Sequence, residues 1–536
     1  MPVLKQSRGG GRPAAATPRV RPRAAYAAVA LLALTAAACD ASTATNASRQ
    51  PKPSGKAGGT LTIATSSSPQ TLDPAKTVQN NAYFEAAAYE PLIVRRSDGA
   101  LQPGLATSWR YLGAHNTTLE LRLRPGVKFA DGSALTAQAV VDHFDYVAKS
   151  GGQYAPFFTG DTFTATDPLT VRIKAPKPNP DLPTLLTQDN VVGGVISPAG
   201  LKNAAKLGTQ TFGAGRYTLD PAQTVAGDHY TYVANPNYYD KAAVHWKKLV
   251  IRVIASPQAT LNALKTGQID FAVGDLSTLT AAKQARLLVT STPLLWTGVT
   301  LADRDGRLAR PLADVRVRQA LNLGVDRRSI AAALFPGSGA PTGQLTVPGG
   351  YGYDAGLNGT YPYDVAKAKR LLAAAGHPNG FTLKIVTADY NSMNLVAQAL
   401  AQQWKKIGVT LQITDYANAN QYFSAAFARK FPAFMTIFGQ QPIWTEGPSL
   451  YLPSALFNPF HTSDDKLRAL YDKDAKATGQ DKQLLDRQIE AYLVQQAWFV
   501  PVVTTGLPFY ANQKVTGTNV SPTAPLASLY EIQPAV

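Results

Sequence analysis

Residues 364–414 read DVAKAKRLLAAAGHPNGFTLKIVTADYNSMNLVAQALAQQWKKIGVTLQIT and indicate the fold class on their own. In the first thirteen residues apolar side chains recur at helical spacing, Asp364 is placed to cap the helix, and Pro378 prevents its continuation. The remainder alternates between the two periods, with a strand at 381–387, a helix at 395–407 and a strand at 409–414. Such a unit predicts two parallel strands joined by a right-handed crossover, and hence an α/β fold.

The same two periods continue on both sides of this unit. We expect strands at Thr60–Thr65, Thr118–Leu123 and Phe499–Val503, and helices after Thr136 and over Leu484–Gln496. The composition suits a large folded body, since 45% of the 536 residues are hydrophobic and 16% are charged. The 9% aromatic share excludes wholesale disorder. No apolar run of about 20 residues occurs, which excludes a polytopic membrane protein.

Residues 1–38 are interpreted as a signal peptide. Met1–Arg23 is basic, and Ala24–Ala38 is apolar and ends in small residues. Cys39 follows directly and is the only cysteine, so no disulfide within the chain is possible. This arrangement resembles a bacterial lipoprotein signal, in which the cysteine is lipidated, although Ala36 stands where such signals usually carry Leu. The alternative is a plain secretion signal followed by a coincidental cysteine.

Residues 39–57 contain no large apolar side chain and are expected to form a flexible tether. The formal net charge is +17, but six of the 52 basic residues and no acidic residue precede Cys39. The remaining 46 basic residues, against 35 acidic ones, are scattered and form no stripe. Nucleic-acid binding is therefore not expected. A mildly basic surface near an anionic membrane explains the charge better.

A series of segments carries a resemblance to one known family. In chain order they are GGTLTIATSSSPQTLDPA (58–75), YEPLI (89–93), PGLATSW (103–109), LRPGVKFADGSALTAQAVV (123–141), FGAGRY (212–217), NPNYY (235–239), LNALKTGQIDFAVGD (261–275), DVRVRQALNLGVDR (314–327) and residues 361–381. They resemble the family-5 extracellular solute-binding proteins, which are the substrate-binding subunits of ATP-driven importers for oligopeptides, dipeptides and nickel. The resemblance extends from Gly58 to about Val515.

The resemblance implies a two-lobed α/β clam of the periplasmic-binding-protein type with an extra α/β domain in the first lobe. Lobe one would combine residues 58–90, 213–293 and 506–536, the extra domain would be 91–212, and lobe two would be 294–505. The Gly213-Ala214-Gly215 stretch would be a structural turn back into lobe one. These boundaries come from the family and not from composition.

The resemblance also implies a function. The chain would be a lipid-anchored substrate-binding subunit on the extracytoplasmic face of the bacterial membrane, in the periplasm or cell-wall space. It would act as a monomer that closes its lobes over a peptide or peptide-like solute and delivers it to membrane permease subunits, without a cofactor. A non-peptide solute, such as a sugar or a metal complex, is the alternative, and a tethered extracellular hydrolase is a second one.

Catalytic and metal-binding patterns are missing from the sequence. The six histidines show no HxH, HxxH or HExxH spacing, and there is no GxSxG elbow or phosphate-binding loop. His143 follows Thr136 on an expected helix and is interpreted as part of a solvated face. Asp142 with Asp145, and Asp464 with Asp465, are interpreted as surface or helix-start residues. No enzyme is predicted.

Residues 431–460 are apolar, aromatic and interrupted by Gly and Pro, which argues against long regular elements. The family places the cleft-lining loop of lobe two here. Peptide-binding members carry an Asp after Gly-Trp that pairs with the ligand's α-ammonium group, whereas this chain has no Asp between Asp415 and Asp464. The candidate ligand-binding residues of this loop are Gly439, Gln440, Gln441, Trp444 and Glu446.

The other wall of the cleft is expected after the first strand, at Asn80, Asn81, Tyr83 and Phe84, with Trp296 at the entry to lobe two. Glu446, which has a longer side chain than Asp, is one possible substitute for the missing Asp. The alternative is that neutral Gln440 and Gln441 bind an N-blocked peptide or an uncharged polar solute such as a sugar. An atypical peptide-class ligand is the interpretation that the sequence favours.

Overall fold

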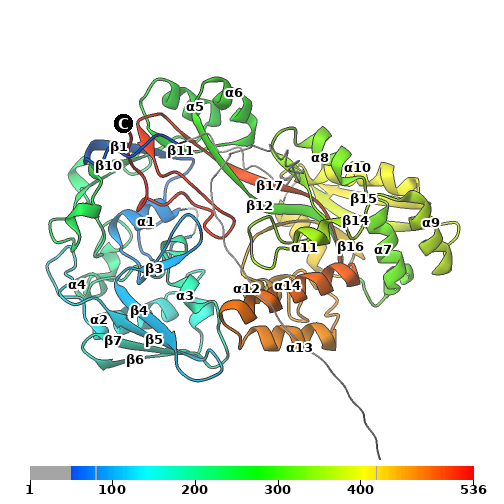
Figure 1. Cartoon of the computed structure of the whole chain (residues 1–536), viewed down its shortest axis with the longest axis horizontal. Coiled ribbons are helices and arrows are strands. Elements are labelled where there is room, and N and C mark those ends of the chain that lie inside the picture. Colours follow the sequence, from blue (N-terminus) through cyan, green and yellow to red (C-terminus); the bar gives the residue numbers. More distant parts are fainter. Residues whose placement is uncertain (1–49, 79–80, 418) are drawn as a thin grey trace, which may run out of the picture. The chain divides into compact units, whose positions relative to one another are not determined.

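The computed structural model describes residues 50–78, 81–417 and 419–536 (Figure 1). Cys39, residues 1–38, which were interpreted as a signal peptide, and Asn80 lie outside these residues. The strands of the largest sheet are β1 (Gly58–Thr65), β8 (Tyr217–Leu219), β9 (His229–Ala234), β10 (Trp246–Val253), β11 (Phe271–Val273), β12 (Leu288–Leu301), β13 (Gly339–Pro341), β14 (Phe381–Ala388), β15 (Val409–Tyr416), β16 (Ala433–Gly439) and β17 (Phe499–Ala511). Their order is β15-β14-β16-β12-β17-β11-β1-β10-β9-β8, and β13 pairs with β17.

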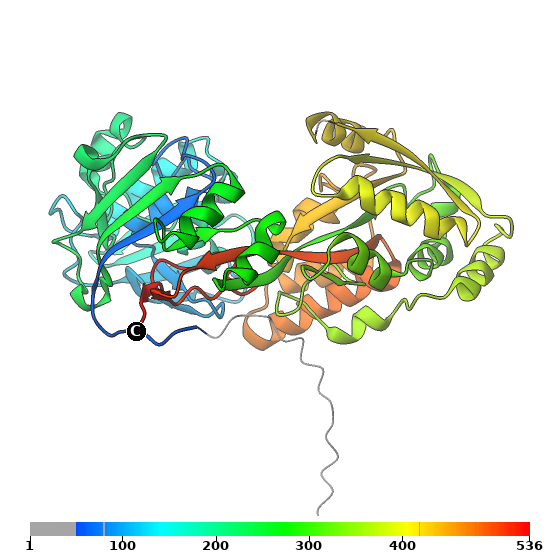
Figure 2. The same ribbon diagram turned by 90° about the horizontal axis from the view of Figure 1, so that it is seen from above.

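Two long strands connect the two halves of this sheet. β12 and β17 pair antiparallel from Leu288 opposite Ala511 to Thr300 opposite Phe499, with register shifts at Pro293/Leu295 and Thr297/Gly298. One end of the pair joins β11, and the other end joins β16. Figure 2 shows β17 running from one group of elements into the other. We call the part built on β1, β8–β11 and their helices the first half, and the part built on β13–β16 and their helices the second half.

The helices of the first half are α1 (Ala82–Ala88), α2 (Ala137–Lys149), α3 (Leu182–Leu185), α4 (Pro198–Lys202), α5 (Pro257–Lys265) and α6 (Leu279–Gln284). A hairpin of β2 (Ile93–Arg95) and β3 (Leu101–Pro103) and a four-stranded sheet also belong to it. That sheet has the order β4-β5-β7-β6 and consists of β4 (Ala106–Tyr111), β5 (Thr118–Leu123), β6 (Thr162–Asp167) and β7 (Thr170–Lys174). It shares a hydrophobic core with α2, including Leu121, Phe144 and Ile173, to which Ala75 and Ala214 also contribute.

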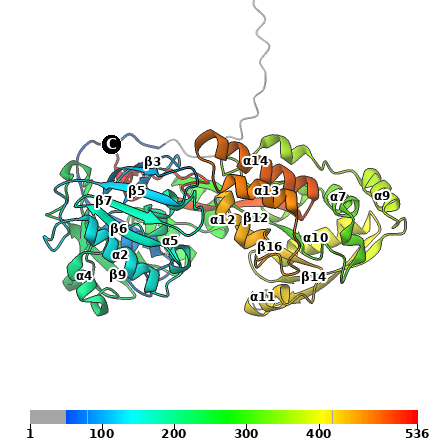
Figure 3. The ribbon, with the colours of Figure 1, turned by 90° about the horizontal axis from the view of Figure 1, so that it is seen from below.

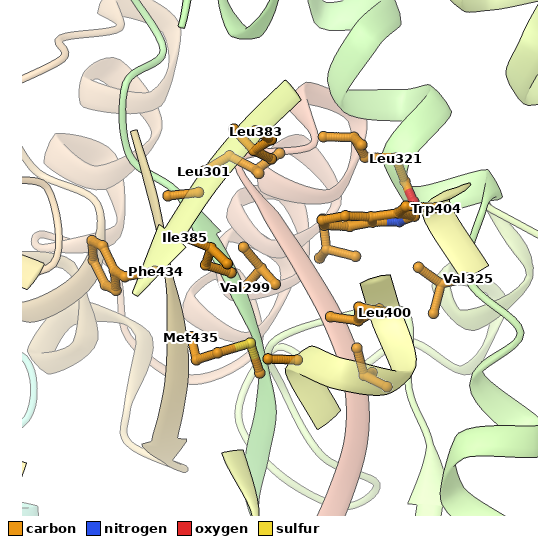
Figure 4. Close-up of a cluster of buried hydrophobic side chains, with 14 of the residues drawn as sticks. Val299, Leu301, Leu321, Val325, Leu383, Ile385, Leu400, Trp404, Phe434 and Met435 are labelled. Atoms are coloured by element: carbon orange, nitrogen blue, oxygen red, sulfur yellow. The ribbon is translucent and has the colours of Figure 1, made fainter. Parts of the chain in front are cut away.

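The helices of the second half are α7 (Val315–Leu323), α8 (Arg327–Leu334), α9 (Val365–Ala374), α10 (Met393–Lys405), α11 (Ala419–Phe427), α12 (Ile443–Leu450), α13 (Asp465–Asp474) and α14 (Gly479–Gln496). Its main core packs α7, α8 and α10 against β12, β14 and β16 (Figure 4). Trp404 is fully buried there, and its indole N–H donates to the carbonyl of Leu321 over 2.9 Å. Figure 3 shows α13 and α14 running side by side.

The strand–helix–strand unit predicted from residues 364–414 is confirmed. β14 and β15 pair in parallel from Phe381 opposite Val409 to Ala388 opposite Tyr416. Asp364 caps α9 by accepting from the backbone N–H of Lys367 over 2.7 Å. α10 begins two residues earlier than expected, after Ser392, whose φ of 61° turns the chain into the helix.

Two sequence-based interpretations need correction. His143 is fully buried on α2, with Nε2 2.9 Å from the carbonyl oxygen of Val192, and burial lowers its pKa to about 4. It lies between Val140 and Val147 at helical spacing, so it belongs to the apolar face and not to a solvated one. Residues 50–57, expected to be part of a flexible tether, lie along the C-terminal segment, where Gln50 Oε1 accepts from the N–H of Gly517 over 2.7 Å.

The remaining segments complete the fold. β18 (Val515–Thr516) and β19 (Gln533–Pro534) form a small sheet near the C-terminus. The Gly213-Ala214-Gly215 turn packs directly against the end of α1. The approach is so close that a Cβ on Gly213 would lie 2.2 Å from the carbonyl oxygen of Ala88. Among the described residues, no helix is long and apolar enough to cross a membrane.

Candidate ligand-binding cavity

A cavity of about 890 Å³ is lined by residues of both halves and by the strands that connect them. Such a volume lies within the range of about 300–1,000 Å³ that is usual for small-molecule sites. Leu294, Leu295 and Thr505–Pro508 come from β12 and β17, so the backbone that joins the halves also lines the cavity. Phe157 and Leu276 are more than a third exposed, and they add apolar surface to the first-half wall.

Three charged side chains of the first half line the cavity although each is at least 95% buried: Arg95, Asp181 and Asp189. Arg95 ends β2 and is held by Gln188, whose side chain accepts from the N–H of Arg95 over 2.9 Å and donates to its carbonyl oxygen over 2.6 Å. Nε of Arg95 lies 3.5 Å from Oδ2 of Asp189. Burial raises the pKa of Asp189 to about 6, and the charge of Arg95 opposes that rise.

The guanidinium of Arg95 keeps hydrogen-bonding capacity. Nη1 donates to the backbone carbonyl of Thr523, which belongs to the C-terminal segment. Nε and Nη2 are buried and have no hydrogen-bond partner among the described residues, and the same holds for Oδ2 of Asp189. Arg95 and Asp189 therefore form an ion pair that neutralises charge without satisfying all the donors of the guanidinium.

Asp181 stands before α3 and faces the second half. Its Oδ2 accepts a hydrogen bond from Thr445 Oγ1 of α12 over 2.9 Å. A second link between the halves lies nearby, where Asn116 Nδ2 donates to the carbonyls of Ala475 over 3.2 Å and Ala477 over 3.0 Å. Asp181 thus lies where the first half meets α12 and α13, at one side of the cavity.

An acidic cluster with one lysine lies behind Asp181 in the second half. Lys482 Nζ is 3.0 Å from Asp474 Oδ2 and 3.0 Å from Asp486 Oδ1, both carboxylates being buried. Burial raises the pKa of Asp181, the charge of Lys482 opposes this, and Asp486 adds to it. Burial likewise raises the pKa of Asp474 to about 7 against the charge of Lys482. The positive charge of Lys482 therefore acts on three carboxyl groups, those of Asp181, Asp474 and Asp486.

The predicted loop residues Gly439, Gln440 and Gln441 line the cavity. The amide of Gln440 is occupied within the protein, since Oε1 accepts from the N–H of Val347 over 3.0 Å and Nε2 donates to the carbonyl of Gln441 over 2.9 Å. The side chain of Gln441 is half-buried and makes no hydrogen bond among the described residues. Gln440 therefore holds the wall in place, and Gln441 keeps its amide available.

Those of the other predicted residues that the structure describes do not line the cavity. Phe84 is fully buried against Tyr230, and Trp296 is fully buried against Phe499. Asn81 and Tyr83 are buried at the start of α1, and half-buried Trp444 packs in the core around α12. Apart from Asn81, these are large aromatic side chains that were expected in a cleft, but they pack in hydrophobic cores instead.

Glu446 does not reach the cavity either. It is 1% exposed on α12, and its Oε1 has no hydrogen-bond partner among the described residues. Burial raises its pKa well above the usual range, and the charges of Glu490 and Asp486 raise it further. Glu446 is therefore buried away from the cavity and is not placed to replace the missing Asp.

Residues 431–460 contain more regular structure than their glycines and prolines indicated. β16 is followed by only three residues before α12, which contains Pro448. Pro448 cannot donate to the carbonyl of Trp444 four residues earlier. That carbonyl instead accepts from the hydroxyl of Tyr471 on α13 over 2.6 Å. The neighbouring helix therefore satisfies the group that the proline leaves unpaired.

The charged first-half wall was not identified from the sequence. Arg95 lies two residues after buried Ile93 and so on the same face of the strand, which is a weak signal of an inward-facing arginine. Asp181 and Asp189 lie in a stretch of short turns without a period that could place them. Among the described residues, no group of His, Cys, Asp or Glu side chains is arranged to hold a metal ion.

Comparison with known proteins identifies the family. The model of the bacterial extracellular solute-binding proteins, family 5, matches residues 100–455. Heme-binding protein A of Haemophilus influenzae is 26% identical over an alignment of 422 residues that covers 72% of this chain and 75% of that protein. The probable D,D-dipeptide-binding periplasmic protein DdpA of Escherichia coli is 26% identical over 487 residues, covering 86% of this chain and 92% of that protein.

A solved structure shows the same two-lobed fold. HbpA2 from Haemophilus parasuis superposes with a TM-score of 0.79 at 22% sequence identity, covering 89% of this chain and 100% of that chain. The expected fold class, a two-lobed α/β binding protein, is confirmed. Because the family model matches well over half of the sequence, the chain belongs to the family-5 bacterial extracellular solute-binding proteins.

Proposed function

We propose that this protein is the substrate-binding subunit of an ATP-driven importer and captures a peptide or peptide-like solute in the cavity between its halves. The observation that carries the proposal is the cavity of about 890 Å³, which takes its lining from both halves and from the two strands that connect them. A solute bound there would contact both halves at once, and such contacts favour a closed arrangement over an open one.

The peptide class rests on two supports. The relative DdpA is described as a probable D,D-dipeptide-binding protein. The lining also combines charged side chains, a free amide and apolar surface, which suits a molecule with polar ends and an apolar body. The relative named for heme binding gives the non-peptide alternative, a solute of another class carried by the same importer role.

The cellular setting is part of the proposal. Lipidation of Cys39 would hold the protein on the extracytoplasmic face of the membrane, close to the permease subunits. The protein would act there as a monomer without a cofactor and without catalysing a reaction. Replacing Cys39 by Ser should release the protein from the membrane fraction. Wild-type protein that is fully released and whose N-terminal peptide carries no lipid mass would contradict the anchor.

Ligand retention tests the importer role most simply. The protein is purified under native conditions from its own host, denatured, and the released small molecules are identified by mass spectrometry. A peptide or peptide-like compound retained at close to one per chain is the expected result. The matched control is a chain with Gly439→Trp, because Gly439 lines the cavity and an indole there would fill part of it. Equal retention by this variant would contradict binding in the cavity.

A further inference from the structure

We propose that Asp181 binds a cationic group of the ligand, so that the solute carries an ammonium or guanidinium group into the cavity. This inference rests on the proposed function and names the ligand chemistry of the same site. The resemblance implies an acid in the loop after β16 of peptide-binding family members. In this chain no acidic side chain of that loop lines the cavity. The carboxylates of the lining come instead from the first half, at Asp181, Asp189 and Asp275.

The charge balance distinguishes Asp181 from the other two. Asp189 has its own cation, because Nε of Arg95 is 3.5 Å from its Oδ2. Asp275 is exposed and uses Oδ1 to accept from the N–H of Ser277 over 2.8 Å. Asp181 is 95% buried and accepts one hydrogen bond, from the neutral hydroxyl of Thr445. It is therefore the buried carboxylate of the lining that lacks an ion-pair partner among the described residues.

The surroundings of Asp181 add negative charge. The charge of Lys482 in the second half acts on Asp181, but Lys482 also forms ion pairs with Asp474 and Asp486 at 3.0 Å. The titratable groups that act on Asp181, or on which it acts, are Tyr111, Tyr351, Tyr471, Lys482 and Asp486. Four carboxyl groups, those of residues 181, 189, 474 and 486, share the charges of Arg95 and Lys482. A ligand cation would give Asp181 an ion-pair partner of its own.

The position of Asp181 also couples the cation to closure. Thr445 belongs to α12 of the second half, so the hydrogen bond to Asp181 links the two halves at the cavity. A cation beside Asp181 keeps the carboxyl ionised, and an ionised carboxylate is the stronger acceptor for the Thr445 hydroxyl. The same ligand group would therefore satisfy the buried acid and strengthen the contact between the halves.

The test uses tripeptide libraries that lack Lys, Arg and His, in free and N-acetylated form, and a third library that is N-acetylated but contains Lys or Arg. A panel of neutral sugars is added. Retained compounds are identified by mass spectrometry and their affinities measured by calorimetry. Wild-type protein should retain compounds with a cationic nitrogen and reject their uncharged counterparts. Asp181→Asn, which is nearly isosteric, should weaken binding of the retained cations roughly 30-fold or more.

Two further variants separate loss of charge from loss of fold. Asp181→Glu keeps the charge and should recover part of the affinity. Glu446→Gln removes a buried carboxyl that does not line the cavity and should bind like the wild type. Retention of uncharged compounds by wild type and Asp181→Asn alike would overturn the inference and leave the importer role standing. Retention of nothing from any library would contradict the proposed peptide-class function, and the inference with it.

Discussion

The two walls of the cavity are built in opposite ways. The second-half wall is neutral, with the amide of Gln440 occupied by Val347 and Gln441. The first-half wall carries Arg95, Asp181 and Asp189, which are all buried. Arg95 and Asp189 keep polar atoms that have no hydrogen-bond partner among the described residues. Buried charges lower the stability of the folded state unless they are paired. A wall that keeps three of them is therefore suited to recognising a ligand, at some loss of stability. The neutral wall sets the shape of the cavity, and the charged wall sets its chemistry.

The largest expected effect concerns a residue that supports the neutral wall without touching the cavity. Trp296→Ala should lower the free energy of unfolding by about 3–5 kcal/mol, because it empties a fully buried indole site against Phe499. Urea denaturation measures the loss, and Trp444→Ala, at a half-buried site, is the milder control. A Trp296→Ala chain of unchanged stability that binds its ligand weakly would make Trp296 a ligand contact.

The next effect tests the ion pair of the charged wall. Arg95→Met removes the cation beside Asp189 and should cost about 3 kcal/mol of unfolding free energy at pH 7.5. The loss should shrink on acidification. Burial raises the pKa of Asp189 to about 6 in the wild type, and without Arg95 it rises further, so the stability lost at pH 7.5 returns as pH falls through that pKa.

Denaturation of Arg95→Met at pH 7.5 and at pH 5 checks this sign. The double variant Arg95→Met/Asp189→Asn has no charge left in the pair and should recover most of the stability at pH 7.5. An equal loss for Arg95→Met at both pH values, not rescued by Asp189→Asn, would show that Arg95 acts through packing and its bond to Thr523 and not through the pair.

A smaller effect is expected at the contact between the walls. Thr445→Val keeps the volume of the side chain and removes the hydroxyl that donates to Asp181. One hydrogen bond of about 1 kcal/mol corresponds to about a fivefold weaker affinity for a ligand that requires closure. Calorimetry measures it, with Thr462→Val, whose buried hydroxyl has no partner among the described residues, as the matched control. Equal affinities in both variants would exclude a role for this contact in closure.

The smallest effects separate two neighbouring amides of the neutral wall. Gln440→Ala leaves the N–H of Val347 without its acceptor and should lower stability by about 1 kcal/mol. Gln441→Ala breaks no side-chain hydrogen bond among the described residues and should leave stability within about 0.5 kcal/mol, while changing affinity. Thermal unfolding and calorimetry on both variants check the pair. If Gln440→Ala instead changes affinity and Gln441→Ala lowers stability, Gln440 and not Gln441 contacts the ligand.

The sequence predicted regular elements better than it predicted the site. The period of apolar residues gives β14, α10 and β15 to within two residues, because each element packs one face against a core. It placed His143 wrongly, although Val140 and Val147 mark the face on which this residue lies. Large aromatic residues such as Phe84 and Trp296 were expected at the ligand, but burial of their apolar area is worth more in the cores.

The charged wall could not be predicted because no local pattern connects its members. Arg95 comes from a short strand, Asp181 from the start of α3, and Asp189 from a single turn. Only the folding of residues 91–212 brings them to one side of the cavity. The family resemblance predicted that Gly439 and Gln441 line the cavity. Such a resemblance transfers positions along the chain, but it does not say which residue would compensate for a missing acid.

The measurement that tests the account most directly is a structure of the complex with a compound that the wild-type protein retains. We expect the compound in the cavity between the halves, with a cationic nitrogen about 3 Å from a carboxylate oxygen of Asp181 and with contacts to Gln441 on the opposite wall. A compound bound elsewhere, or one in the cavity whose cationic nitrogen faces away from Asp181 toward solvent, would contradict the account.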